Sequence, residues 1–407
     1  MPASPLKLLF LAEGATLAHV ARPCVLAQGL DPDAFEVVLA RPSGFAWLTA
    51  GGPFRTLDLA CQDASVFARR LEHGRPLYDY ATLSAYVEQD LALIDAERPD
   101  VVVGDFRLSL SVSARLRNVP YVTICDAYWS PEYPSQPPLP VLSFTRFTPI
   151  PLASLLFRYV APLAMRLHTL PLERLRAHHG LPSLGHDLRR CYTDADLRLF
   201  ANFPELFPEL MESRHATFIG PISWSPPDGA PLDFASSEKP LVYVTMGSSG
   251  DIGVLGSVID ALGGFDCEIV VTTAGRKIPA ELRAPSTRIF DYLPGDRVCA
   301  LASLVVCNGG SPTTNQALAH GVPVLGIASN MDQFLNMRAV EDFGAGILVR
   351  GDRAGPARLR AAAEALLTQA PYAARARELA AVAAQRTASA TFAHSIQGLL
   401  QGSAPRN

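Results

Sequence analysis

Short runs of apolar residues recur along the chain, with helix-like segments between many of them, and this rhythm limits the fold more than any other feature. Five lie in the first half: "LKLLFLAE" (6–13), "FEVVLAR" (35–41), "DVVVGDF" (100–106), "PYVTICDA" (120–127) and "LRLFANF" (197–203). Five lie in the second: "LVYVTMG" (241–247), "CEIVVTTAG" (267–275), "TRIFDYLP" (287–294), "ASLVVCNGG" (302–310) and "PVLGIAS" (323–329). Because they do not alternate with polar residues, they are typical of strands covered on both faces, as in parallel sheets. We expect an α/β protein with two doubly wound, Rossmann-like domains.

A stretch without a regular pattern separates the two series. Residues 220–240, "GPISWSPPDGAPLDFASSEKP", are rich in Pro, Ser, Gly and Asp, as in a linker. We predict an N-terminal domain over 1–222, a linker over 223–239, a C-terminal domain over 240–385 and a C-terminal helix and tail over 386–407. The Ala- and Arg-rich sequence after Pro356 is helical by propensity and is expected to cover the C-terminal domain.

One predicted strand runs directly into a turn with distinctive chemistry, "NGGSPTT" (308–314). Its two glycines would let a ligand approach the main chain closely. We expect Ser311 to be the N-cap of a helix and Pro312 its first residue. The exposed amides of that first turn would favour a diphosphate at the positive end of the helix. The hydroxyls available to assist are those of Ser311, Thr313 and Thr314. A tight turn without a ligand is the alternative.

The sequence around this turn, residues 308–333, resembles the donor-binding signature of inverting GT-B glycosyltransferases. These form the UDP-glycosyltransferase superfamily, which includes plant secondary-product and bacterial macrolide enzymes. The signature runs His-Gly-Gly-x-Gly-Thr-x-x-Glu-Ala, then Gly-x-Pro, then Asp-Gln. The matching positions are Gly309, Gly310, Thr313, Ala317, Gly321, Pro323, Asp332 and Gln333. The resemblance implies a GT-B fold, in which two Rossmann-like domains face each other across a cleft.

Two upstream segments extend the resemblance. "LVYVTMGSSG" (241–250) resembles the family's first C-terminal strand with its glycine-serine turn, and "RIFDYLPGDRV" (288–298) resembles the loop that receives the nucleobase. The resemblance implies donor contacts at Gly247, Ser248, Ser249, Tyr292 and Leu293. It also implies that Asp332 and Gln333 bind hydroxyls of the donor sugar, with loop capping by the aspartate as the alternative role.

Three positions depart from the signature: Asn308 stands for its histidine, Pro312 for its third glycine and Gln316 for its glutamate. In the family the histidine donates to a phosphate and the glutamate grips the ribose hydroxyls. Asparagine and glutamine still form hydrogen bonds, but they supply neither an imidazolium nor a carboxylate. A TDP-sugar is therefore an alternative to a UDP-sugar as the donor.

The N-terminal half offers a general base. In "AEGATLAHVARPCVLAQGL" (12–30) a first strand ends at Glu13, and His19 stands just before a helix. This resembles the loop in which the family places its catalytic histidine, which would take a proton from the acceptor hydroxyl. Asp105 ends another predicted strand and resembles the aspartate of the family's His-Asp pair, which would hold the imidazole. An N-cap or an ion pair with Arg107 is the alternative role for Asp105.

Composition excludes other classes. A net charge of −4, with no basic stripe, argues against nucleic acid as a partner. Seven widely spaced cysteines without a C-x-x-C pair indicate reduced thiols in a cytoplasmic protein. No metal is implied, because the pairs Asp31/Asp33 and Asp194/Asp196 suit turns better than ligands. No G-x-G-x-x-G follows either first strand, which disfavours a nicotinamide dehydrogenase.

Residues 144–181 carry apolar residues at near-helical spacing together with five arginines. A buried helix pair is the main interpretation; a membrane-surface helix and the wall of an apolar pocket are the others. With the aromatic, Pro-rich residues 126–140, this segment suggests a hydrophobic small-molecule or lipid acceptor and allows a peripheral membrane contact. We therefore expect an inverting glycosyltransferase with a nucleoside diphosphate sugar as co-substrate and no further cofactor. A sugar-nucleotide 2-epimerase and a non-catalytic nucleotide-sugar-binding partner are the alternatives, and oligomeric state stays open.

Overall fold

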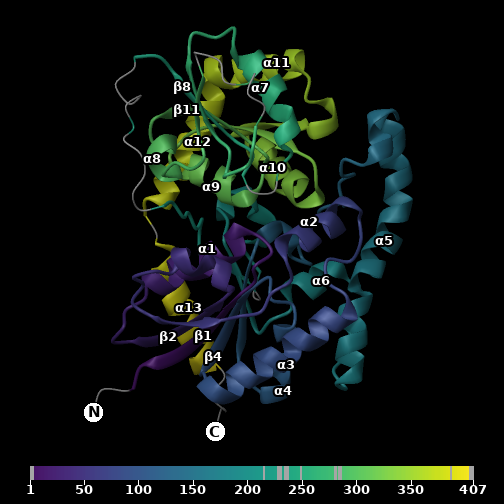
Figure 1. The fold of residues 1–407 in the computed structure, drawn as a ribbon, viewed down its shortest axis with the longest axis vertical. Helices are drawn as coiled ribbons and strands as arrows, with labels where there is room; N and C mark the ends of the chain where they lie inside the picture. The colour runs from purple at the N-terminus through teal and green to yellow at the C-terminus, as the bar shows by residue number, and fades with distance from the viewer. Residues whose placement is uncertain are drawn as a thin grey trace.

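The computed structural model describes residues 4–213, 216–226, 232, 238–247, 250–278, 282, 287–385 and 387–402. Within them lie two parallel sheets, one above the other in Figure 1, each with helices on both faces. The α/β prediction with two doubly wound domains is confirmed. Much of the predicted linker lies outside the described residues.

The N-terminal sheet has seven parallel strands in the order β3-β2-β1-β4-β5-β6-β7. Its strands are β1 (Leu6–Ala12), β2 (Phe35–Arg41), β3 (Arg55–Asp58), β4 (Val101–Asp105), β5 (Tyr121–Cys125), β6 (Leu197–Phe200) and β7 (Ala216–Phe218). Its helices are α1 (Leu17–Gln28), α2 (Ala64–Glu72), α3 (Tyr80–Glu97), α4 (Leu110–Arg117), α5 (Ile150–His178) and α6 (Leu188–Thr193).

The C-terminal sheet has six parallel strands in the order β10-β9-β8-β11-β12-β13. Its strands are β8 (Leu241–Thr245), β9 (Glu268–Thr272), β10 (Thr287–Phe290), β11 (Ala302–Cys307), β12 (Val324–Ala328) and β13 (Gly346–Arg350). The helices that follow the linker are α7 (Leu255–Leu262), α8 (Gly295–Cys299), α9 (Ser311–Ala319), α10 (Met331–Phe343), α11 (Pro356–Thr368), α12 (Ala370–Ala383) and α13 (Ala388–Gly402).

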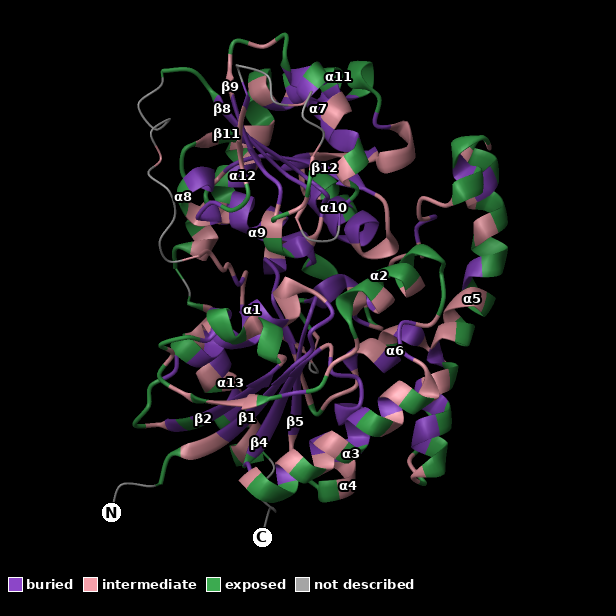
Figure 2. Cartoon of the chain, in the orientation of Figure 1, coloured by how far each residue is buried: buried purple, intermediate pink, exposed green. Residues whose placement is uncertain are grey.

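Burial on both faces explains the unbroken apolar runs. Along β1, Leu8 and Phe10 pack in the cluster that holds α1, whereas Leu9 and Leu11 pack in the cluster that holds α3 and α4. Successive side chains of a strand point to opposite faces, so both sets of positions must be apolar. Figure 2 shows the central strands as the most continuously buried elements of the chain.

Helix α13 corrects one prediction. The Ala-rich C-terminal sequence was expected to cover the C-terminal domain throughout, but only α11 and α12 do so. Phe392 and Ile396 of α13 are fully buried in the core of the N-terminal sheet, and the Phe392 ring stacks on Phe10 at 5.6 Å between centroids. The chain therefore ends on the domain where it began (Figure 1). Propensity predicted the helix, but it carries no information about which sheet the two large side chains fill.

A second correction concerns residues 144–181. A buried helix pair was the main interpretation, but the segment forms one 29-residue helix, α5, that runs along the outside of the molecule (Figure 1). Pro162 and Pro171 lie inside α5 without dividing it. Most residues in the first half of α5 are exposed.

Candidate active site

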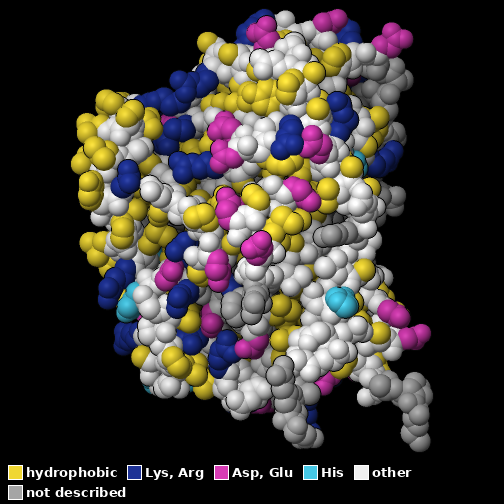
Figure 3. Space-filling view, turned by 180° about the vertical axis from the view of Figure 1, so that it is seen from behind, with side chains coloured by type: hydrophobic (Ala, Val, Ile, Leu, Met, Phe, Trp, Pro, Cys, Tyr) yellow, Lys and Arg dark blue, Asp and Glu magenta, His cyan; other side chains and the backbone are white. Residues whose placement is uncertain are grey.

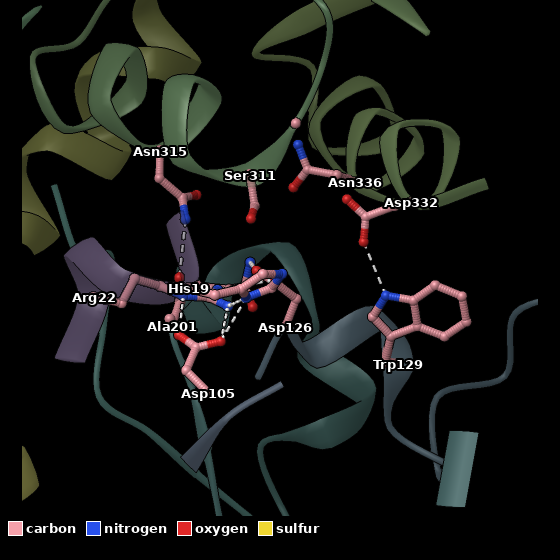
Figure 4. A network of polar contacts seen from close by, with 12 residues as sticks. His19, Arg22, Asp105, Asp126, Trp129, Ala201, Ser311, Asn315, Asp332 and Asn336 are labelled. Carbon is pink, nitrogen blue, oxygen red and sulfur yellow. Dashed lines mark hydrogen bonds and ion pairs between the residues drawn. The ribbon is translucent and has the colours of Figure 1, made fainter. Parts of the chain in front are cut away.

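The two sheets meet at their carboxyl ends. Trp129, just after β5, donates from Nε1 to Asp332 Oδ1 at 2.9 Å, and Asp332 lies just after β12. Asn315 of α9 donates from Nδ2 to the carbonyl of Ala201, just after β6, at 2.9 Å. Figure 4 shows side chains from both domains directed into this interdomain junction. Open parallel sheets bind ligands outside the carboxyl ends of their strands, so the junction is where a site is expected.

Strand order places the predicted residues there. In the N-terminal sheet the order reverses between β1 and β4, and His19 follows β1 while Asp105 ends β4. In the C-terminal sheet the order reverses between β8 and β11; Gly247 follows β8 and Asn308 follows β11. Such reversal points leave a crevice beside the strand ends, because the adjacent connections turn to opposite faces. Both halves of the predicted site therefore lie at reversal points.

His19 and Asp105 form a close pair. His19 Nδ1 lies 2.7 Å from Asp105 Oδ1, and 17% of the His19 side chain is exposed while Asp105 is fully buried. His19 is the third residue of α1, whereas the sequence placed it just before the helix. With Nδ1 facing the carboxylate, Nε2 is the ring nitrogen left for a ligand.

Arg22, one helical turn after His19, completes this cluster and was not foreseen. Its Nε and Nη2 donate to the two oxygens of Asp105 at 2.7 and 2.8 Å, and its Nη1 donates to Asp126 at 3.0 Å. Burial opposes ionisation of Asp105, but the Arg22 charge and the hydrogen bonds from His19 and Arg22 outweigh it, so the pKa of Asp105 lies below its usual value. The sequence held part of the signal, because residues i and i+3 of a helix share a face.

The alternative partner of Asp105 is engaged elsewhere. Arg107 is fully buried and forms ion pairs with Glu13 and Asp90, at 3.2 and 3.0 Å. Its guanidinium also stacks over the ring of Tyr86, 3.6 Å from the centroid. The alternative ion pair between Asp105 and Arg107 is therefore not formed, and Asp105 pairs with His19 and Arg22 instead.

An aromatic wall, Phe106, Tyr192 and Trp129, extends from the His-Asp pair across the junction. Phe106 stacks on His19 at 5.0 Å between centroids, Tyr192 meets Phe106 edge to face at 5.0 Å, and Trp129 meets Tyr192 at 5.0 Å. Phe106 adopts φ of +58°, an uncommon conformation for a bulky side chain that tends to occur at functional sites. All three rings are partly exposed, so they can contact an apolar ligand.

The glycine turn after β11 is close to its prediction, with the cap shifted by one residue. Gly310 is the N-cap of α9, Ser311 is its first residue and Pro312 its second. Gly309 has φ of +78°, and a Cβ there would lie 2.6 Å from Met337 Cγ, so the turn requires glycine at this position. Helix geometry leaves the amides of Ser311 and Thr313 without intrahelical partners, and α9 directs its positive end into the junction.

The hydroxyls of this turn have different surroundings. Thr314 is fully buried, and its Oγ1 accepts from Asn336 Nδ2 at 2.8 Å and lies 3.1 Å from the Ser311 carbonyl. Its predicted role in diphosphate binding is not supported by this orientation, because the hydroxyl is used inside the fold. Ser311 points from α9 toward the His19 cluster (Figure 4). Asn308 accepts from the Gly310 amide through Oδ1 at 3.2 Å, which stabilises the turn.

Asp332 and Gln333 separate into different roles. Asp332 is partly exposed at the junction, and burial together with the nearby Asp126 carboxylate raises its pKa. Gln333 is buried, and its Oε1 accepts from the amides of Ser329 and Asn330 at 2.8 and 3.3 Å in a capping box for α10. Loop capping, the alternative considered for Asp332, is therefore carried out by Gln333, which was not predicted, and Asp332 stays available for a ligand.

Gln316 lies in a polar cluster with Asp296 of α8 and with Ser225, in the segment that follows the N-terminal domain. Its Nε2 donates to Asp296 Oδ1 at 3.0 Å and to Ser225 Oγ at 3.1 Å.

Arg276, which was not foreseen, supports the loop after β8. It donates to the carbonyls of Gly247 and Gly250 at 2.6 Å each.

The remaining predicted donor residues differ in exposure. Tyr292 is 59% exposed and donates to the Ala274 carbonyl at 3.1 Å, whereas the Leu293 side chain is buried in the core. Ser248 and Ser249 lie outside the described residues.

Other polar groups that the sequence singled out have structural partners. Asp194 pairs with Arg176 at 3.1 Å and Asp196 with Arg115 at 2.7 Å, while Asp31 accepts from the amide of Asp33 in a turn. Within the described residues no three His, Cys, Asp or Glu side chains are arranged to hold a metal ion. All seven cysteines are free thiols.

Comparison with known proteins finds relatives that cover most of the chain. Residues 256–399 match the family model of the erythromycin biosynthesis protein CIII-like C-terminal domain. A PGL/p-HBAD biosynthesis glycosyltransferase of Mycobacterium tuberculosis is 43% identical over 92% of this chain and 88% of its own length. A PGL/p-HBAD biosynthesis rhamnosyltransferase of Mycobacterium bovis is 43% identical over 90% of this chain and 82% of its own length.

Solved structures share the fold at low sequence identity. The glycosyltransferase of kitacinnamycin superposes with a TM-score of 0.71 at 18% identity, covering 97% of this chain and 99% of its own. The Streptomyces sp. SF2575 glycosyltransferase in complex with thymidine diphosphate superposes with a TM-score of 0.70 at 17% identity over the same shares. This chain therefore belongs to the GT-B glycosyltransferase family that includes the mycobacterial PGL/p-HBAD biosynthesis glycosyltransferases.

Proposed function

We propose that this glycosyltransferase moves a sugar from a nucleoside diphosphate sugar to a hydroxyl of a hydrophobic acceptor, with inversion at the anomeric carbon and His19 as general base. The observation that carries this proposal is the His19 Nδ1 to Asp105 contact of 2.7 Å at the carboxyl end of β4. It supports one tautomer, in which Nδ1 carries the proton and Nε2 is free to accept one.

The step balances with groups of this chain. The acceptor oxygen forms a bond to the anomeric carbon as the bond from that carbon to the diphosphate oxygen breaks. The acceptor proton passes to His19 Nε2, and the electron pair of the broken bond leaves with the nucleoside diphosphate. Asp105 stabilises the imidazolium, and the free amides at the start of α9 with the Ser311 hydroxyl stabilise the leaving diphosphate. Asp332 accepts from a hydroxyl of the donor sugar.

A TDP-linked deoxysugar fits the donor side best. One curated relative is named a rhamnosyltransferase, and one structural neighbour was solved with thymidine diphosphate. Gln316 supports the same choice: it lacks the carboxylate that grips ribose hydroxyls in the family, and its amide is engaged by Asp296 and Ser225. Gln316 is therefore less suited to bind the ribose 2'-hydroxyl of a UDP-sugar than the glutamate of the family is.

The aromatic wall supports a hydrophobic acceptor. Phe106, Tyr192 and Trp129 form a continuous series between the proposed base and Asp332, so an acceptor poised for attack would lie against ring faces and edges. The cytoplasmic location inferred from the free thiols is part of this proposal, since it would place the enzyme with nucleotide sugars.

Thermal shift and product analysis test the proposal. TDP should raise the melting temperature more than UDP at equal concentration, because selective binding stabilises the folded state. Nucleoside diphosphate should be released only when an acceptor is present, which separates transfer from 2-epimerisation and from non-catalytic binding. The NMR coupling of the product's anomeric proton should show inversion relative to the donor; retention would overturn the mechanism.

A further inference from the structure

Helix α5 presents an apolar face to solvent. The exposed apolar side chains recur at spacings of three and four residues, so they share one side of the helix. They are Leu152, Leu155, Leu156, Tyr159, Val160, Leu163, Leu167 and Leu170. Tyr159 is 80% exposed, and Leu163 is 62% exposed. We call this set the α5 apolar face.

The side of α5 that faces the protein is built from small residues over the same stretch. Ala153, Ala161 and Thr169 are buried there. A surface helix ordinarily buries its large apolar side chains and exposes polar ones, so α5 is inverted. The apolar face runs from Leu152 to Leu170, roughly 27 Å at the rise of an α-helix. Contiguous apolar surface of this length marks an interaction site.

The attachment of α5 determines how such a surface would be used. It is the one helix in the described part of the chain long and apolar enough to cross a membrane, which by itself is weak support for a span. Its last third is built into the N-terminal domain: Leu172 and Leu175 are buried, and Arg176 donates to the Ser111 carbonyl at 2.6 Å. A partner would therefore contact the side of α5 along its length.

The charged side chains of the segment that carries the apolar face have one sign. Residues 133–172 contain no Asp or Glu and three arginines, Arg146, Arg158 and Arg166, although the whole chain carries a net charge of −4. Figure 3 shows hydrophobic side chains gathered over α5, at the left edge of that view, with Lys and Arg side chains among them. The side chains of Arg158 and Arg166 form no hydrogen bond or ion pair with any described residue. Their charges are therefore available to an anionic surface.

We propose that the α5 apolar face lies in the plane of an anionic lipid bilayer, with its leucines among the acyl chains and Arg146, Arg158 and Arg166 at the headgroups. In-plane helices of this type combine an apolar face with flanking basic residues. A second copy of this chain fits less well. An isologous dimer brings the same patch of both subunits together, so the arginines of both copies would lie in one interface to which residues 133–172 contribute no carboxylate.

The position of α5 indicates how a membrane contact would serve access of the acceptor, and this consequence rests on the proposed function. The segment just before α5 is held by the C-terminal domain, where Arg353 Nη2 donates to the carbonyl of Thr145 at 2.9 Å. The C-terminal part of α5 packs on the N-terminal domain. A bilayer under α5 would therefore lie beside both domains, and a lipid-soluble acceptor would reach the enzyme without crossing water.

Vesicle flotation tests the proposal with the full-length protein. Wild type should float with phosphatidylcholine vesicles that contain phosphatidylglycerol, and added salt should weaken this binding. Replacing both Leu156 and Leu163 by Glu should weaken binding by about 10-fold or more, the ratio that burying even one leucine corresponds to. Arg158→Glu with Arg166→Glu should abolish the preference for phosphatidylglycerol. Met211→Glu, at an apolar residue that is 62% exposed elsewhere, is the matched control and should bind like wild type.

Two further readouts keep the result interpretable. The altered side chains are exposed, so circular dichroism and the melting temperature should match wild type. The TDP-induced thermal shift should also be unchanged, which separates a failure of this proposal from a failure of the proposed function. Absence of flotation by wild type would overturn the proposal, as would unchanged flotation of the Leu156/Leu163 double variant. A dimer in light scattering that the same variant dissociates, without vesicle binding, would assign the face to a second copy instead.

Discussion

Replacing Asp105 by Asn tests whether a carboxylate sets the state of His19. Asp105 is fully buried and lies within 2.8 Å of three donors, His19 Nδ1 and Arg22 Nε and Nη2. Asparagine keeps the shape but removes the charge, and its amide can donate to Nδ1. The proton would then reside on Nε2, which could no longer accept from the acceptor hydroxyl.

These contacts set the expected loss of kcat and the expected loss of stability of Asp105→Asn. The wrong tautomer in an analogous His-Asp pair costs ~10⁴-fold in kcat, so we expect a loss of ~10³- to 10⁴-fold, or about 4–5.5 kcal/mol of activation free energy. Breaking a buried ion pair costs ~3–5 kcal/mol, and Arg22 keeps its bond to Asp126, which places the loss near the lower figure. A protein with a total stability of ~5–15 kcal/mol would then still fold.

The assay measures kcat and KM from nucleoside diphosphate release, together with urea unfolding and the TDP-induced thermal shift. The KM for the donor and the thermal shift should stay near wild type, because Asp105 belongs to the N-terminal domain. The double variant Asp105→Asn/His19→Ala should be no slower than His19→Ala alone, since residues that act as a unit are not additive. A kcat within 10-fold of wild type for Asp105→Asn would refute the reasoning.

Three more predictions follow from other contacts. Gly309→Ala should destabilise the protein by about 2 kcal/mol or more and weaken the TDP-induced shift, because the position needs φ of +78° and the new Cβ would meet Met337; Gly398→Ala, in open space within α13, is the control and should be neutral or stabilising in urea unfolding. Asp332→Asn should raise the melting temperature by ~2–4 °C, the shift that ~1 kcal/mol gives, because the carboxylate's pKa is raised by burial and by Asp126, while the KM for the donor rises. The free energy of unfolding should fall in acid: the folded-state pKa of Asp105 is below its unfolded value of about 3.9, so its stabilisation is complete above that pH and is lost as the pH falls through the folded value. Urea midpoints that are flat between pH 5 and pH 2, after subtraction of the same series for Asp105→Asn, would contradict the last prediction.

Much of the fold was predictable because burial on both faces of a strand leaves a continuous apolar run. The ten predicted strands all form, whereas β3, β7 and β13 were missed. These three lie at sheet edges, where β3 has no buried residue, so the pattern that identifies a central strand is absent. Periodicity also could not predict the inverted polarity of α5. It indicates that a helix has an apolar face, but not whether that face points to the protein or to solvent.

The predicted site residues divide in the same way. The resemblance to the family identified His19, Asp105 and the Gly309 turn, and they lie together because strand ends at order reversals meet at the junction. It did not predict Arg22, because its role depends on two carboxylates 83 and 104 residues away in sequence. It also did not predict that Gln333 caps α10, since a capping box and a sugar contact require the same residue type.

The kinetics of His19→Ala test the central claim most directly. His19 supplies the only proposed proton acceptor, and its side chain holds no part of the glycine turn that would bind the donor. The account predicts that transfer to the acceptor is lost, with kcat at least ~10²-fold lower, while the TDP-induced thermal shift stays at the wild-type value. Transfer at the wild-type rate by this variant would contradict the account.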